Sequence, residues 1–135
     1  MTSSVEFTSA QRARRASRVL VVDDDPEVRT ILCDALSDEG YLADQATDGA
    51  DALRHIASQI HPDLILMDLR MPVMDGYQFL ERRLLDQTLQ QIPVIVVSAT
   101  VDREIDPKVQ RVRKPFDLGE LLRLVDSELT RQPAA

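Results

Sequence analysis

The strongest constraint on the fold is a set of short apolar runs that each stop at a polar or charged residue. The runs, each with the residue that follows it, are Val19–Val22 with Asp23, Leu64–Met67 with Asp68, and Val94–Val97 with Ser98. Apolar runs of four residues are typical of strands that are buried on both faces of a parallel sheet. The chain must therefore end buried strands on groups that prefer water.

Helical patterns alternate with these runs. Asp25 and Pro26 supply an N-cap and a proline at the first helical position, so we assign Asp25 to the cap rather than to a metal. Asp117 and Glu120 form a D-x-x-E capping box before a last amphipathic helix. Strands that alternate with helices predict an α/β fold with a parallel sheet and right-handed crossovers. We expect a doubly wound, five-stranded parallel sheet in the flavodoxin-like order 2-1-3-4-5.

Length and composition fit one domain. The 135 residues, 44% of them hydrophobic, suffice for one ordinary core. We expect a folded domain over residues 18–130, a flexible polar tail over 1–17 and a short tail over 131–135. Three arginines in the first tail, Arg12, Arg14 and Arg15, fit a solvated segment better than a contact with a partner.

The charge balance limits the classes of partner. The net charge of −7 works against general attraction to nucleic acid or to an anionic membrane. The only cysteine, Cys33, cannot form a disulfide within the chain, and no apolar run approaches the roughly 20 residues that span a bilayer. We therefore expect a cytoplasmic protein that contacts proteins and small ions, without direct nucleic-acid or membrane binding.

The acids at the strand ends predict a cation site. In a sheet of order 2-1-3-4-5, ligands bind beyond the carboxyl ends of strands 1 and 3, which here stop at Asp23–Asp24 and at Asp68. Two unit charges about 4 Å apart repel by roughly 4 kcal/mol at an effective dielectric constant near 20. A hard divalent cation with oxygen ligands, Mg²⁺, is the expected neutraliser. Ser98 and Lys114 are expected to enter the same cleft from strands 4 and 5.

Four motifs in this order resemble the receiver domain of bacterial response regulators, over about residues 18–130. The motifs are Val-Val-Asp23-Asp24, Asp68 followed by Met71-Pro72-x-Met74-Asp75-Gly76, Pro-Val-Ile-Val-Val-Ser98-Ala99, and Lys114-Pro115-Phe116. The resemblance implies that Asp68 accepts a phosphoryl group from a histidine kinase or a phosphotransfer protein. A downstream protein target would then read a conformational change, and the chain would be a monomer or a phosphorylation-dependent dimer.

The same resemblance assigns roles to the residues of the cleft. Asp24 would bind Mg²⁺ directly, Asp23 directly or through water, and Arg70 through its backbone carbonyl, with Asp68 completing the metal ligands. Lys114 would pair with a phosphoryl oxygen and Ser98 would donate a hydrogen bond to it. The chain would catalyse only its own phosphorylation and dephosphorylation and would not otherwise be an enzyme.

Two departures from the family concern the region between Ser98 and Lys114. Most receivers place an aromatic residue three positions before the lysine, where this chain has Arg111, and only fifteen residues separate Ser98 from Lys114. We expect the fourth helix to be short or disordered, and a segment near residues 100–110 to become ordered on phosphorylation. We also expect Arg70, two residues after the acceptor, to shield the phosphoryl group from water.

Other functions remain open at this stage. A pseudo-receiver, which keeps the fold but works without phosphorylation, is the main alternative, and the presence of Asp24, Asp68 and Lys114 argues against it. An Mg²⁺-dependent phosphohydrolase would need an acid two residues after the nucleophile, where Arg70 stands. The sequence fits either a stand-alone receiver or a piece of a larger regulator.

Overall fold

The structure is a computed structural model that describes residues 17–58 and 61–131. Most of the predicted tails, including Arg12, Arg14 and Arg15, lies outside the described residues. The predicted boundaries at 17 and 131 therefore stay predictions.

Strands and helices alternate along most of the chain, as the sequence predicts, except that α5 follows α4 and no helix separates β4 from β5. In order, the elements are β1 (Arg18–Val22), α2 (Pro26–Asp38), β2 (Leu42–Ala46), α3 (Gly49–Ala57), β3 (Leu64–Met67), α4 (Gly76–Leu84), α5 (Gln87–Gln90), β4 (Val94–Ser98), β5 (Gln110–Arg113) and α6 (Leu118–Arg131). All neighbouring strands pair in parallel, in the order β2-β1-β3-β4-β5. The predicted doubly wound sheet is thereby confirmed.

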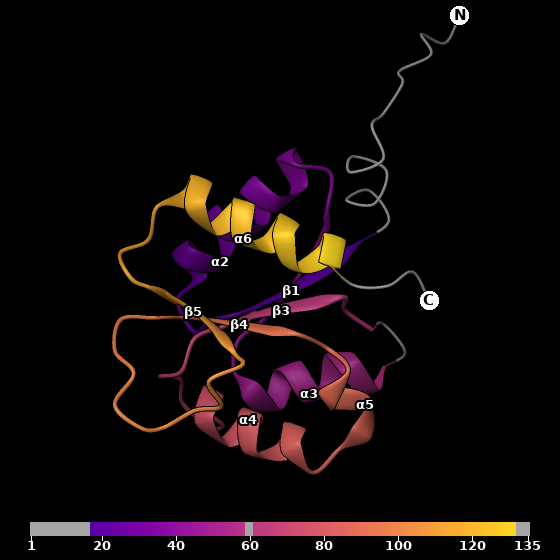
Figure 1. Cartoon of the computed structure of the whole chain (residues 1–135), viewed down its shortest axis with the longest axis vertical. Helices are drawn as coiled ribbons and strands as arrows, with labels where there is room; N and C mark the ends of the chain where they lie inside the picture. The colour runs from indigo at the N-terminus through magenta and orange to yellow at the C-terminus, as the bar shows by residue number, and fades with distance from the viewer. Residues whose placement is uncertain (1–16, 59–60, 132–135) are drawn as a thin grey trace, which may run out of the picture.

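Helices cover both faces of the sheet. Figure 1 shows α2 and α6 on one face and α3, α4 and α5 on the other. Because the side chains of a strand point alternately to opposite faces, each central strand contributes to two hydrophobic layers. In β1, Val19 and Val21 pack with the layer of α2 and α6, whereas Leu20 and Val22 pack with the layer of α3 and α4. Burial on both faces explains why the strands read as unbroken apolar runs.

The register of the strands places their ends together. Val22 of β1 is paired with Met67 of β3, so the residues that follow, Asp23 and Asp68, leave the sheet side by side. The backbone continues this pairing, since the Asp68 N–H donates to the Val22 carbonyl at 2.9 Å. In the same way Ser98 of β4 is paired with Arg113 of β5, directly before Lys114.

The local signals for helix ends are largely as expected. The Asp25 carboxylate accepts a hydrogen bond from the Glu27 N–H, which confirms its role as the cap of α2. At α6, the Asp117 carboxylate accepts from the Glu120 N–H at 2.9 Å, one half of the predicted capping box. A complete capping box forms instead at α4, where Asp75 and Gln78 satisfy each other's backbone N–H groups.

The connection from β4 to β5 contains no helix. Residues 99–109, all of them described, form an irregular segment with a single turn at 107–108, in agreement with the expectation that the fourth helix would be short or disordered. The segment is nevertheless packed, because Val109 is buried and Ile105 contacts the apolar layer beside α4. The connection is thus too short for the helix, but it still packs against the rest of the domain.

Candidate functional site

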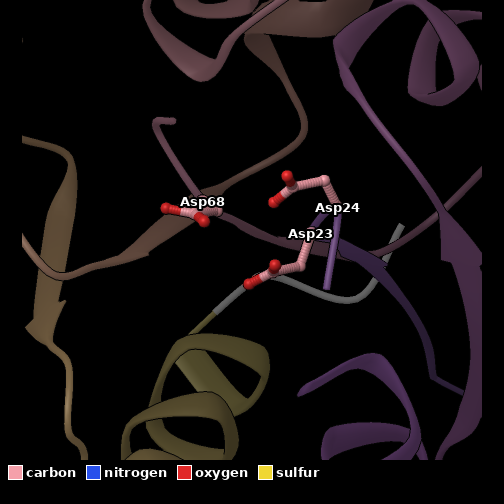
Figure 2. A group of neighbouring side chains, drawn as sticks. All are labelled: Asp23, Asp24 and Asp68. Carbon is pink, nitrogen blue, oxygen red and sulfur yellow. The ribbon is translucent and has the colours of Figure 1, made fainter. Parts of the chain in front are cut away.

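Three carboxylates meet at the carboxyl ends of β1 and β3. Oxygens of Asp23, Asp24 and Asp68 all lie within 4.8 Å of one another. Figure 2 shows the Asp23 and Asp24 side chains leaving the end of β1 on the same side of the molecule as the Asp68 carboxylate. Asp23 and Asp68 are buried, whereas Asp24 is exposed. The cluster is therefore open to solvent on the side of Asp24.

Backbone groups and a lysine fix the Asp68 carboxylate. Its Oδ1 accepts hydrogen bonds from the N–H groups of Leu69 at 2.7 Å and Arg70 at 3.4 Å. Its Oδ2 lies 3.2 Å from the Lys114 Nζ. A glycine at 76 allows helix α4 to touch the Asp68 backbone, because a Cβ there would lie 2.4 Å from the Asp68 carbonyl oxygen. Both the side chain and the main chain of Asp68 are consequently held in place.

Lys114 joins the two buried acids. Its Nζ lies 2.7 Å from Asp23 Oδ2, closer than to Asp68, and Asp23 Oδ1 accepts from the Asp25 N–H at 2.9 Å. Burial and the charge of Asp68 raise the pKa of Asp23, and together they outweigh the hydrogen bonds from Lys114 and Asp25 and the charge of Lys114. For Lys114, burial lowers the pKa, but the bonds and charges of Asp23 and Asp68 outweigh it and raise the pKa overall.

The charges of the cluster fit a divalent cation. One lysine faces three carboxylates, so a negative excess of two charges remains when all four groups are ionised. Carboxylate oxygens are the ligands that Mg²⁺ prefers, and Mg²⁺ commonly binds to one or two carboxylates while it keeps several waters. The exposed position of Asp24 leaves room for such waters. The residues present therefore fit the predicted Mg²⁺ site.

The side chains of Ser98 and Arg70 contact groups other than the acids. Ser98 is buried at the end of β4, and its Oγ donates to the Thr100 carbonyl at 3.1 Å. The Arg70 guanidinium forms an ion pair with Asp102, a residue of the connection from β4 to β5. The structure thus brings together Asp23, Asp24, Asp68 and Lys114, and the Arg70 backbone N–H joins them at Asp68. Ser98 ends the neighbouring strand β4 with its hydroxyl on Thr100. The roles of all six residues stay predictions.

The described helices include none that combines the length and the apolar character needed to cross a bilayer.

The family model of the response regulator receiver domain matches residues 19–126. The chain belongs to this family. Receiver domains are the phospho-accepting modules of two-component signalling systems, and the resemblance drawn from the sequence is thereby confirmed.

Curated relatives and solved structures agree with this assignment. The chain is 38% identical to Regulatory protein AtoC of Escherichia coli over 124 residues, which cover 86% of this chain but 26% of AtoC. It is 34% identical to Protein Rrf1 of Nitratidesulfovibrio vulgaris over 115 residues, 84% of this chain and 83% of Rrf1. The signal receiver domain of a histidine kinase from Syntrophus aciditrophicus superposes with a TM-score of 0.76 at 28% identity, over 89% of this chain and 97% of that one.

This receiver also contains contacts around the site and around the connection from β4 to β5 that the sequence analysis missed. The Arg29 guanidinium donates to the Asp23 carbonyl at 2.6 Å, and the buried Tyr77 hydroxyl bonds to Asp102. Arg29 lies one helical turn after the Asp25 cap, so the sequence could have indicated that its side chain lies close to the end of β1. The contact between Tyr77 and Asp102 joins residues 25 positions apart through an irregular segment, and no local pattern announces it.

Proposed function

We propose that this receiver domain accepts a phosphoryl group on Asp68, with Mg²⁺ held by Asp23, Asp24, Asp68 and the Arg70 backbone carbonyl. The observation that carries the proposal is the position of Lys114, whose Nζ lies within hydrogen-bond reach of both Asp68 and Asp23. An ion pair with a purely structural role would need only one acid to balance the charge of Lys114. Three converging acids, one of them exposed, instead suit a site that binds a cation and an anion together.

The proposed reaction is a transfer between two covalent partners. An Asp68 carboxylate oxygen attacks the phosphorus of a phosphohistidine, so that an O–P bond forms while the N–P bond to the histidine breaks. Phosphoryl transfer depends mainly on position and on stabilisation of charge. The hydrogen bonds to Asp68 Oδ1 orient the nucleophile, and Lys114 lies where it can pair with an oxygen of the transferred group. The divalent cation supplies further neutralisation of that charge.

Ser98 completes the proposed set. Its hydroxyl exchanges the Thr100 carbonyl for a phosphoryl oxygen, which is the stronger acceptor because it is charged. Hydrolysis of the acyl phosphate returns Asp68 to its free form, and Arg70 shields the phosphoryl group from water. In this proposal the receiver promotes only its own phosphorylation and dephosphorylation.

The partners follow from the same proposal. The phosphoryl donor is a histidine kinase or a histidine phosphotransfer protein, and the recipient of the signal is a downstream protein in the cytoplasm. Because the chain spans a quarter of AtoC and most of Rrf1, the family includes receivers both with and without long additional regions. Output through a further domain and output through a separate protein are therefore both compatible with this chain. Its oligomeric state stays a prediction.

Intact mass spectrometry after incubation with acetyl phosphate and Mg²⁺ tests the proposal. We expect a phosphate-sized increase that requires Mg²⁺ and that is absent in Asp68→Asn. Asp24→Asn should need far more Mg²⁺ for the same increase. Asp25→Asn is the matched control, because it removes a neighbouring charge while asparagine keeps the ability to cap α2.

The outcomes separate the two interpretations of the domain. An unchanged mass with every donor, a kinase included, would remove the proposal and favour a pseudo-receiver. An increase that persists in Asp68→Asn would move the acceptor to another residue. Equal effects of Asp24→Asn and Asp25→Asn would contradict the assignment of the metal ligands.

A further inference from the structure

Residues 100–103, which we call the bridging segment, connect the end of β4 to the surface of α4. In this region most receivers carry a helix and an aromatic partner for the hydroxyl residue of β4, and this chain has neither, since Arg111 is exposed and residues 99–109 are irregular. A signal from Asp68 must therefore travel through other contacts. The contacts of the bridging segment form two groups, one toward α4 and one toward the site.

Tyr77 holds the bridging segment to α4. The tyrosine is 5% exposed, and its hydroxyl accepts hydrogen bonds from the N–H groups of Asp102 at 3.0 Å and Arg103 at 3.3 Å. The same hydroxyl donates to Asp102 Oδ1 at 3.0 Å. Arg103 adds a contact over the Tyr77 ring, 4.8 Å from its centroid, and an ion pair with Glu81. These contacts join the bridging segment to residues of α4.

Two further tethers run from the bridging segment to the site itself. The Ser98 Oγ donates to the Thr100 carbonyl at 3.1 Å, and the Arg70 guanidinium pairs with Asp102. Ser98 ends the strand next to that of Asp68, and the Arg70 N–H lies 3.4 Å from Asp68 Oδ1. Both tethers therefore start on groups that lie beside the acceptor.

We propose that a phosphoryl group on Asp68 releases the bridging segment from both site tethers and leaves it held only by its contacts with α4. The inference rests on the proposed function of Asp68. Phosphorylation adds a charge of about −1.5 to −2 and strong acceptor oxygens, which attract both the Ser98 hydroxyl and the Arg70 guanidinium. Each of these groups then exchanges its bond to the bridging segment for a bond to the phosphoryl group.

The relative strengths of the contacts favour this exchange. The side chains of Arg70 and Asp102 are 63% and 47% exposed, and ion pairs at such positions are weak. A guanidinium bonds more strongly to a phosphoryl group, because the contact is charge-assisted and can be bidentate. Asp102 then lacks its counter-ion and faces a second negative group. The loss of both tethers therefore loosens the bridging segment, the reverse of the ordering expected from the sequence.

Hydrogen exchange measured by mass spectrometry tests this device. In the wild type, we expect acetyl phosphate with Mg²⁺ to speed exchange of the Asp102 and Arg103 amides roughly tenfold, since a hydrogen bond and an exposed ion pair each contribute a factor of a few. Asp102→Asn should exchange faster without phosphate and respond less to it, while it still takes up phosphate. Glu81→Gln is the matched control, because it breaks a contact of the same segment on the side away from Asp68 and should keep the full response.

Intact mass, recorded on the same samples, distinguishes the two ways in which the experiment can fail. No phosphate uptake in the wild type would refute the proposed function. Full uptake with unchanged or slower exchange of the bridging segment would refute the release of the tethers and leave the proposed function standing. An undiminished response in Asp102→Asn would show that the ion pair with Arg70 plays no part in it.

Discussion

Replacing Gly76 by alanine tests how closely α4 is packed against the acceptor strand. Gly76 is the first residue of α4, and a Cβ at this position would lie 2.4 Å from the Asp68 carbonyl oxygen and 2.8 Å from the Leu69 Cα. Both atoms belong to the backbone, so neither can turn away as a flexible side chain would. To accept a methyl group, α4 must move relative to the residue that carries the acceptor carboxylate.

Two opposing effects determine how much the Gly76→Ala substitution changes the free energy of unfolding. Alanine is favoured over glycine within a helix by up to about 1 kcal/mol, partly because it restricts the unfolded chain. Overpacking of a close contact costs about 1–3 kcal/mol and occasionally more, and contacts below 3 Å with backbone place this site at the upper end. We expect a net loss of about 2 kcal/mol in the free energy of unfolding, or roughly 8 °C in Tm.

Urea denaturation followed by far-ultraviolet circular dichroism is the suitable assay, since the chain has no tryptophan. Gly119→Ala is the matched control, because Gly119 also lies in the first turn of a helix but is exposed, and its Cβ would come no closer than 3.3 Å to a side-chain oxygen. This control should be neutral or slightly more stable than the wild type. If Gly76→Ala proved as stable as Gly119→Ala, the proposed close contact between α4 and Asp68 would be wrong.

Two further predictions concern the acid cluster and its loop. Burial raises the pKa of Asp23 above 3.8, so the folded chain binds this proton more tightly than the unfolded chain, and the contribution of Asp23 to stability falls as the pH rises from 3.8 through the raised value. Without Mg²⁺, Asp23→Asn should therefore gain stability relative to the wild type as the pH increases from 3.5 to 7, and a constant stability difference between the two proteins across this pH range would contradict the burial argument. Excess Mg²⁺ should stabilise only the wild type, by about 2.7 kcal/mol at 100 times its Kd. Val73 is 82% exposed and has a φ of 69°, a left-handed conformation that strains a β-branched residue, so Val73→Gly should raise the free energy of unfolding by about 1 kcal/mol in urea titrations. A loss of stability in Val73→Gly would argue against this backbone conformation.

Much of the fold could be predicted from the sequence because it follows from local residue patterns. Unbroken apolar runs such as Val19–Val22 and Leu64–Met67 indicated strands buried on both faces, and the cap at Asp25 marked the start of α2. Strands that mostly alternate with helices then restrict the sheet to few topologies, because crossovers between parallel strands are almost always right-handed. The convergence of the strand-end acids follows from topology alone, without any knowledge of side-chain packing.

Other features depended on contacts that no local pattern encodes. The close contact of Gly76 with the Asp68 backbone joins the start of α4 to the end of β3. The segment after β4 was expected to gain order on phosphorylation, which stays a prediction, and the contacts of Tyr77 with this segment had no counterpart in the sequence analysis. Such contacts join an irregular segment to a helix, so the residues that make them follow neither the sequence period of a strand nor that of a helix.

The sequence by itself therefore determined the sheet, its strand order and the meeting of the acids with Lys114, because burial and strand alternation leave a chain of this kind few arrangements. Only the tertiary structure decided the surroundings of that site. It paired Arg70 with Asp102, turned the Ser98 hydroxyl toward Thr100, and placed the Tyr77 hydroxyl under the bridging segment. The physical reason is that hydrophobic periodicity specifies which side of an element is buried, whereas hydrogen bonds between distant polar groups depend on distances that are set only after the elements have packed.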